Sequence, residues 1–235
     1  MTHLKRANFK TLAVASAAGL ASIPTSPVYA DDSLTVGGGA GVAPRFIGSD
    51  EVTPIPFPFL EYTRNGRTLR TNQFGFEADL TNSGNWDFGP IVRIDQGRND
   101  FQSASNAVIE TLDDVSAAVE IGGFIETARP ILAPDDGAPL LFTARASLVD
   151  AIGGHNGFLV EPSVGLLRPG QKWTYAASLT TTYASGLFQD AFFSVDAANA
   201  AASGLDVFDA GAGFRDVGVS SLLSYKLSKR RWLNS

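Results

Sequence analysis

Apolar residues alternate with polar or very small residues along most of this sequence, from Asn72 to Lys226. In segment 73–80, Phe, Ala and Leu occupy the even positions, whereas Gln, Gly, Glu and Asp occupy the odd positions. Segment 86–95 repeats the pattern with Ile91 as the exception. Because successive side chains of a β-strand point to opposite faces, this period of two predicts strands with one apolar and one polar face.

The alternation and the turn residues together place the predicted strands. We expect them at about Ser33–Val42, Pro54–Thr63, Thr68–Leu80, Trp86–Gly97, Val115–Arg129, Leu140–Ile152, Gly157–Arg168, Lys172–Ser185 and Phe214–Ser228. Most of these strands exceed the roughly 5–6 residues usual in soluble sandwiches, and they suit the about 9 to 11 residues of a tilted membrane strand. The sequence therefore predicts an all-β, antiparallel barrel that carries its apolar face outward in the outer membrane.

The connections between the predicted strands fall into two kinds. Segments 82–85 and 168–171 are short turns, whereas segments 98–114 and 186–206 are long and rich in polar or small residues. Outer-membrane barrels keep short turns at one rim and long loops at the other. The predicted strand count puts one short turn at the wrong rim, so a strand near residues 54–80 is either missed or wrongly added.

That region contains one clear turn and one ambiguous strand. Asn65-Gly66 predicts a hairpin, because both residues tolerate positive φ. Pro54, Pro56 and Pro58 each lack the N–H that a ladder needs. Two interpretations of segment 54–63 therefore remain: an irregular strand, or an extended segment without strand pairing.

The first thirty residues predict a secretory signal. Lys5, Arg6 and Lys10 form a positive start, an apolar stretch follows from Leu12 to Ile23, and Val28-Tyr29-Ala30 supplies the small residues that signal peptidase requires. The apolar stretch is shorter than the about 20 residues of a membrane-spanning helix. We therefore expect residues 1–30 to be removed after Ala30, leaving residues 31–235 as one barrel domain.

Composition excludes several classes of function. The predicted signal contains three of the 18 Lys and Arg residues and none of the 24 acidic residues, so the remaining chain has a net charge of −9. An acidic chain without a basic run is a poor candidate for binding nucleic acid. The chain has no cysteine, so neither a disulfide framework nor a thiolate metal site can form.

Alternation alone does not decide which face lies inside, because a lipocalin-like barrel would bury the apolar row. Contact of the apolar row with lipid is favoured by aromatic residues at its ends, namely Trp86, Trp173 and Tyr183. The polar row carries both signs of charge, so its members could pair inside a lumen. The residues expected to face the lumen are Glu77, Asp79, Asp87, Arg93, Asp95, Glu120, Glu126, Arg145, Glu161, Asp216 and Lys226.

Two further expectations follow from the parity of the alternation, that is, from whether a residue occupies an odd or an even position in its strand. Val119, Ile121, Val217 and Val219 should face outward, and Phe124 is the exception within its strand. Arg215 and Asp216 are adjacent and should point to opposite sides, which would leave Asp216 to meet Lys226 or Arg93.

The residues offer little for catalysis or for binding a metal or a cofactor. His155, the one histidine after the predicted signal, lies among glycines without the nearby serine and acid of a hydrolase triad, so we interpret it as a polar loop residue. One histidine without cysteine argues against a transition-metal site. Asp113-Asp114 and Asp135-Asp136 lack the spacing of a calcium loop. We expect no catalytic residue, no metal and no cofactor, and therefore no enzyme.

Three stretches resemble the MipA/OmpV family of Gram-negative outer-membrane proteins. They are residues 39–62, with the Pro-rich segment from Pro54 to Tyr62, then Gly153-Gly-His-Asn-Gly157, and residues 209–227. The resemblance implies an outer-membrane β-barrel of about 10 to 12 strands. It further implies, from the best-known member, a non-enzymatic scaffold that joins the murein transglycosylase MltA to a murein synthase.

The chain departs from the family pattern at its end. Family members continue past the strand ending Ser-Tyr-Lys-Leu to a closing strand, whereas this sequence stops at Ser235. We therefore expect a C-terminally incomplete barrel, with an unpaired edge that would be costly in lipid.

The leading hypothesis for function is a scaffold of the outer membrane that interacts with enzymes of murein (peptidoglycan) synthesis and remodelling. The alternatives are a small channel or porin, an adhesin, or more distantly an enzyme that modifies outer-membrane lipid. The expected partners are outer-membrane lipid and periplasmic murein transglycosylase or synthase proteins.

Overall fold

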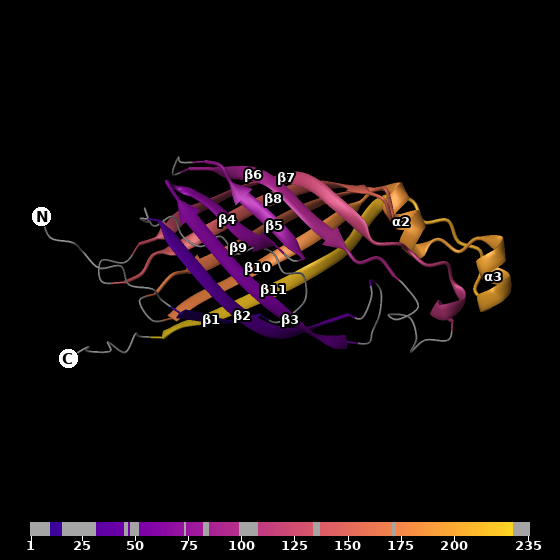
Figure 1. Ribbon diagram of the computed structural model, residues 1–235, viewed down its shortest axis with the longest axis horizontal. Helices are drawn as coiled ribbons and strands as arrows, with labels where there is room; N and C mark the ends of the chain where they lie inside the picture. Colours follow the sequence, from indigo (N-terminus) through magenta and orange to yellow (C-terminus); the bar gives the residue numbers. More distant parts are fainter. Residues whose placement is uncertain are drawn as a thin grey trace, which may run out of the picture.

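A single antiparallel sheet of eleven strands curls into a barrel-like body, with helices at one end (Figure 1). The computed structural model describes residues 10–15, 32–44, 47, 52–72, 74–81, 85–98, 108–133, 137–170 and 173–227. The strand order is β1-β11-β10-β9-β8-β7-β6-β5-β4-β3-β2. In the described part of the chain, β1 and β2 end this hydrogen-bonded order, so no ladder between them closes the sheet. The predicted all-β class is confirmed.

The strands follow the alternation closely. They are β1 (Lys10–Ala15), β2 (Ser33–Pro44), β3 (Val52–Arg64), β4 (Arg67–Asn72), β5 (Gly75–Asp79), β6 (Asp87–Asp95), β7 (Ala118–Leu132), β8 (Leu140–Ile152), β9 (Phe158–Arg168), β10 (Trp173–Ala184) and β11 (Gly213–Leu227). From β2 to β11, each strand pairs with the next one along the chain, so this part is a simple meander.

The segment predicted as one strand from Thr68 to Leu80 is two strands, β4 and β5, so that prediction is wrong. Asn72 pairs with Gly75, which closes a hairpin between them. With this added strand, the turn at Asn65-Gly66 and the connections 80–86 and 169–172 lie at one rim. The long connections 96–117 and 185–212 lie at the other. The predicted strand count therefore lacked one strand near residues 54–80, and the division into β4 and β5 brings the short turns to the same rim.

The proline-rich segment is a paired strand, so the alternative of an unpaired extended segment is wrong. β3 pairs with β2 from Thr63 opposite Ser33 to Val52 opposite Pro44. Leu60, which has the same parity as the three prolines, directs its N–H to the hydroxyl of Thr71 on β4. The prolines therefore lack N–H groups on the β4 side, where the β3–β4 ladder runs only from Glu61 to Arg64.

Two short helices and one 3₁₀ turn lie at the rim of the long connections (Figure 1). They are η1 (Ile109–Thr111), α2 (Gly186–Phe193) and α3 (Ala197–Ser203). The hydroxyl of Ser185 caps α2 and the carboxylate of Asp196 caps α3, each by accepting a backbone N–H. The sequence pattern predicts only a connection over 186–206, whereas the structure forms the helices α2 and α3 there.

The two faces of the sheet differ as the alternation predicts. Val119 and Ile121 on β7 and Val217 and Val219 on β11 are all exposed, which confirms the predicted exposure of these four residues. Charged residues of the other parity, such as Glu120 and Glu126, are buried. Several buried charges contact partners on strands that are not neighbours, which is possible only on the inner face of a curved sheet.

The adjacent residues Arg215 and Asp216 form an ion pair, with 2.7 Å between Arg215 Nε and Asp216 Oδ2. The prediction that they point apart is wrong. The β10–β11 register shifts between Thr182 and Tyr183, whose partners are Asp216 and Phe214, so Arg215 is an extra residue in a bulge. The bulge interrupts the alternation at this point.

Parts of the predicted ends lie outside the described residues. β1 belongs to the segment predicted as a signal and pairs with β11 from Lys10 opposite Leu227. The predicted cleavage site after Ala30, the end of the chain beyond Leu227 and the side chain of Lys226 lie outside the described residues. No described helix has the length and hydropathy needed to cross a bilayer.

Candidate functional site

A balanced cluster of ion pairs occupies the inner face of β4, β5, β7 and β8. Arg145 Nη2 lies 2.7 Å from Glu77 Oε2, and Arg145 Nη1 lies 2.6 Å from Glu126 Oε2. Arg70 closes the ring by bonding both Glu77 and Glu126. Two positive and two negative groups alternate here, so the cluster compensates its own charge.

Phe124 lies beside both arginines of this cluster. The guanidinium of Arg145 is 4.3 Å from the ring centroid, and that of Arg70 is 5.5 Å away. Both distances allow a cation–π contact. Phe124 therefore lies on the inner, mostly polar face of β7, where its ring contacts the two buried cations.

A second charged cluster is centred on Arg93 of β6. Its guanidinium binds Glu161 of β9 in a fork, with distances of 2.9 and 3.0 Å, and its Nε donates to Glu120 of β7. Ser147 Oγ donates to Glu161 at 2.9 Å. The fork holds β6 to β9 across the inner face, because β7 and β8 lie between them in the sheet.

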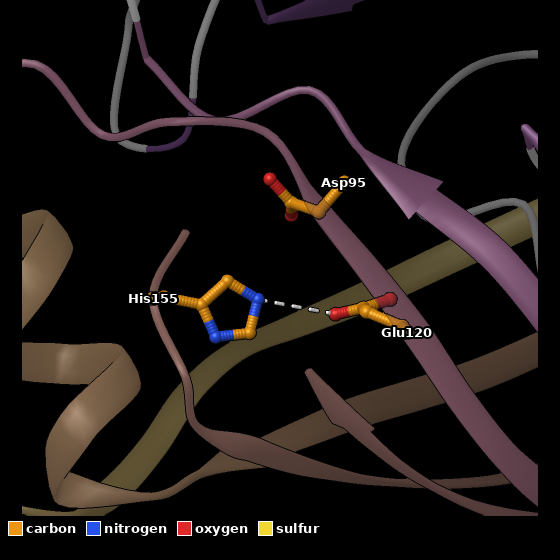
Figure 2. A group of neighbouring side chains, drawn as sticks. All are labelled: Asp95, Glu120 and His155. Carbon is orange, nitrogen blue, oxygen red and sulfur yellow. Dashed lines mark ion pairs between the residues drawn. The ribbon is translucent and has the colours of Figure 1, made fainter. Parts of the chain in front are cut away.

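His155 and Asp95 lie beside this second cluster (Figure 2). One ligand atom from each of Asp95, Glu120 and His155 lies within 4.8 Å of the others. The distance from His155 Nε2 to Glu120 Oε1 is 3.4 Å, and both atoms are buried. Neither atom makes a hydrogen bond of normal geometry to a described residue. Such an arrangement could hold a metal ion or form a charge contact.

The other nitrogen of the ring decides between these two possibilities. The Gly157 N–H donates to His155 Nδ1 at 3.1 Å, so Nδ1 is the unprotonated nitrogen. In a neutral imidazole the proton then lies on Nε2 and points toward Glu120. A histidine that binds a metal through Nε2 instead donates its Nδ1–H to a neighbour. The geometry therefore fits a contact from His155 to the Glu120 carboxylate and not a metal site.

The turn between β8 and β9 is shaped to place His155 inside. Gly153, Gly154 and Asn156 have φ values of 81°, 54° and 49°, a conformation that favours glycine and tolerates asparagine. Asn156 Oδ1 accepts the N–H of Gly153 at 3.1 Å. His155 lies in a loop as the sequence predicts, but its side chain is fully buried, which the sequence alone did not indicate.

Helix α2 covers the same end of the interior. The rings of Phe188 and Phe192 lie 4.7 and 6.0 Å from that of His155. Arg98 Nη1 donates to the carbonyl oxygen of Phe192 at 2.8 Å. Burial lowers the pKa of Arg98, although Asp114 and Asp113 act to raise it, and the guanidinium remains a cation.

Several predicted residues lie outside the two clusters. Asp79 and Asp87 are partly buried and are bridged by the hydroxyl of Thr81, at 2.6 and 3.1 Å. Asp216 is exposed and contacts Arg215, whereas Arg93 binds Glu120 and Glu161, so the predicted pairing of Asp216 with Arg93 is wrong. The alternative partner, Lys226, has its side chain outside the described residues. Arg70 was not among the residues predicted to face the lumen. Its inner position on β4 can be predicted once Thr68–Leu80 is divided into two strands.

The described residues do not bring a free nucleophile to His155. Ser185 lies close to the turn, but its hydroxyl accepts the N–H of Phe158 at 3.0 Å and that of Phe188 at 3.4 Å. Ser185 therefore acts as a helix cap. The arrangement joins strands, turn and helix, and it offers buried, fixed charges instead of an exposed reactive group.

Comparison with known proteins adds one finding. The family model described as "MltA-interacting protein MipA" matches residues 36–233, which is most of the chain. No curated protein and no solved structure matches.

Proposed function

Because this chain belongs to the MipA family, we propose that it is an outer-membrane protein that acts as a non-enzymatic scaffold for murein-remodelling enzymes. The family match is the observation that carries this proposal. The partner class is a lytic transglycosylase of the MltA type, together with a murein synthase. Residues 1–30 are proposed to direct export and to be removed.

The outer face of the sheet supports the membrane location. Large apolar side chains are exposed along it, among them Phe76, Phe88, Ile125, Leu179 and Val217. Apolar patches of this extent are unusual on soluble monomers and indicate a surface that contacts protein or membrane. Lipid is the partner that covers all sides of a barrel at once.

The inner face supports a scaffold better than a wide channel. Arg93, Arg145 and their carboxylate partners reach across the interior between strands that are not adjacent in the sheet. Porins that pass solutes freely use about 16 to 18 strands, whereas this sheet has eleven, of which ten remain once residues 1–30 with β1 are removed. Fixed interior charges stiffen such a small barrel and leave its rims as the surfaces for partners.

The rim of short turns is the proposed docking surface. Outer-membrane barrels expose short turns to the periplasm, where murein enzymes work. Arg67 and Arg168 are exposed at this rim, whereas Leu205 is exposed beyond the opposite rim. These three positions allow the two ends of the molecule to be compared.

Site-specific photocrosslinking tests the proposal. A photoreactive amino acid at Arg67 or Arg168 should crosslink to a murein transglycosylase in intact cells, and the same group at Leu205 should not. Crosslinked proteins are identified by mass spectrometry. The proposal is contradicted if no murein enzyme is captured at either arginine, or if capture at Leu205 is equally strong.

A further inference from the structure

We propose that α2 and the turn 153–157 form a two-part plug that closes the interior at the rim of the long connections, and that displacing α2 opens a narrow passage for small hydrophilic solutes. The passage rests on the proposed location in a membrane. The plug itself rests only on contacts within the chain.

The apolar face of α2 points into the interior. Phe188 and Phe192 are spaced one turn apart on one face of the helix, and their exposed fractions are 0 % and 4 %. They belong to a buried cluster with inner-face residues from five successive strands, namely Ile91, Phe124, Val149, Leu159 and Ala184. Leu187, on the other face of α2, is 61 % exposed. The helix therefore sits in the end of the barrel-like body.

Polar contacts fix both ends of α2. Ser185 Oγ accepts the N–H of Phe158 at the start of β9. Arg98 donates to the carbonyl oxygens of both Phe192 and Asp113, at 2.8 and 3.0 Å. A helix end leaves carbonyl groups without partners inside the helix, so a cation placed there stabilises the end. These contacts tie α2 to two other connections at the same rim.

His155 joins the helix to the charged wall. Its ring lies edge-on against Phe188, and its Nε2 faces Glu120, which is held by Arg93. A Cβ at Gly157 would lie 2.5 Å from the backbone nitrogen of Phe188, so the turn and the helix are in direct backbone contact. The turn and α2 therefore form one packed unit.

The interior below the plug is asymmetric. Bulky charged side chains extend from β4 to β9, as described above. The inner positions of β10 carry only small residues: Thr174, Ala176, Ser178, Thr180 and Thr182. Ser178 bonds Ser220 of β11 at 2.6 Å, so small hydroxyl groups line this side. This side is where a passage for small polar solutes would run once α2 leaves.

Thiol accessibility tests the plug directly, because the chain has no cysteine of its own. Ala184→Cys places a thiol beneath α2, at a position that is fully buried. In this background, Phe188→Ser with Phe192→Ser should raise the rate of maleimide labelling at least about tenfold, since local opening sets the rate at a buried site. His155→Ala should raise it less, and Leu187→Ser should leave it unchanged.

Conductance in planar bilayers tests the passage. The chain with α2 seated should show little steady conductance, and the double serine variant should show at least about tenfold more, with Leu187→Ser as the matched control. Equal conductance of all three proteins would overturn the passage. Fast labelling of Ala184→Cys with α2 intact would overturn the plug. A stoichiometric Zn²⁺ complex that is lost in His155→Ala would overturn the contact of His155 with Glu120, because it requires an unprotonated Nε2.

The thiol measurement needs no membrane. A protein that fails to insert therefore contradicts the proposed location, while its labelling rates still decide whether the plug exists.

Discussion

Arg93 on β6 and Glu161 on β9 form a forked ion pair across two intervening strands, with nitrogen–oxygen distances of 2.9 and 3.0 Å. Side chains on a flat sheet could not meet across that distance, because neighbouring strands are about 4.8 Å apart. The sheet must therefore be curved between β6 and β9, with the charged face on its inner side.

Removing the cation of this pair should be costly. Arg93→Ala leaves the buried carboxylate of Glu120 and the partly buried carboxylate of Glu161 without their main partner, and breaking one side of a buried pair costs about 3–5 kcal/mol. Arg168→Ala, at an exposed position, should change the free energy of unfolding by less than about 0.5 kcal/mol. Urea titration in lipid vesicles measures both. Similar costs for the two variants would argue against a buried Arg93 cluster.

A charge on the outer face should be costly for a different reason. Ile125 lies near the middle of β7 and is exposed. Ile125→Arg should lower the free energy of unfolding in vesicles by about 2–4 kcal/mol, the cost of an arginine near the centre of a bilayer. Leu205→Arg is the control, because Leu205 is exposed beyond the sheet. If Ile125→Arg is as mild as Leu205→Arg, the outer face does not meet hydrocarbon.

A close approach of two strands should make one glycine irreplaceable. A Cβ at Gly122 would lie 1.9 Å from the carbonyl oxygen of Leu148 and 2.7 Å from Cα of Val149. Gly122→Ala should destabilise the fold by about 1–3 kcal/mol, because the backbone of β8 would have to move. Gly211→Ala is the matched control, since nothing lies within 4 Å of its Cβ position. The unfolding midpoints of the two variants decide the point.

The proposed signal makes a prediction about mass. The protein recovered from the outer membrane should begin at Asp31, and Ala30→Arg should block processing, because signal peptidase requires a small residue there. Intact-mass spectrometry distinguishes the two forms. A wild-type protein that retains residues 1–30 would contradict the proposed export signal and would keep β1 beside β11.

The strands could be predicted from the sequence because an apolar face and a polar face impose a strict period of two. β8 was predicted with its observed bounds for this reason. β4 and β5 were merged although the phase of the alternation changes between them. Buried residues are even-numbered in β4, such as Arg70, and odd-numbered in β5, such as Glu77. That change of phase is the signal that marks the turn.

The interior could be predicted only in part. The period of two in the sequence indicates which residues face inward. It does not give the partners of Arg93 and Arg145, because these partners lie on strands distant in sequence and the pairing depends on the curvature of the sheet. Ile91 and Phe124 broke the alternation because they form the apolar part of the interior. The role of His155 depends on α2, a helix too short to stand out from the connection that contains it.

The claim that the apolar face contacts lipid is tested most directly at two neighbouring residues of β10. Leu179 is exposed on the outer face, and Ser178 lies on the inner face, bonded to Ser220. A fluorescent label on Leu179→Cys, in protein folded into vesicles, should be strongly quenched by spin-labelled acyl chains, whereas the same label on Ser178→Cys should be quenched weakly. Equal quenching at both positions, or stronger quenching at Ser178, would contradict the account.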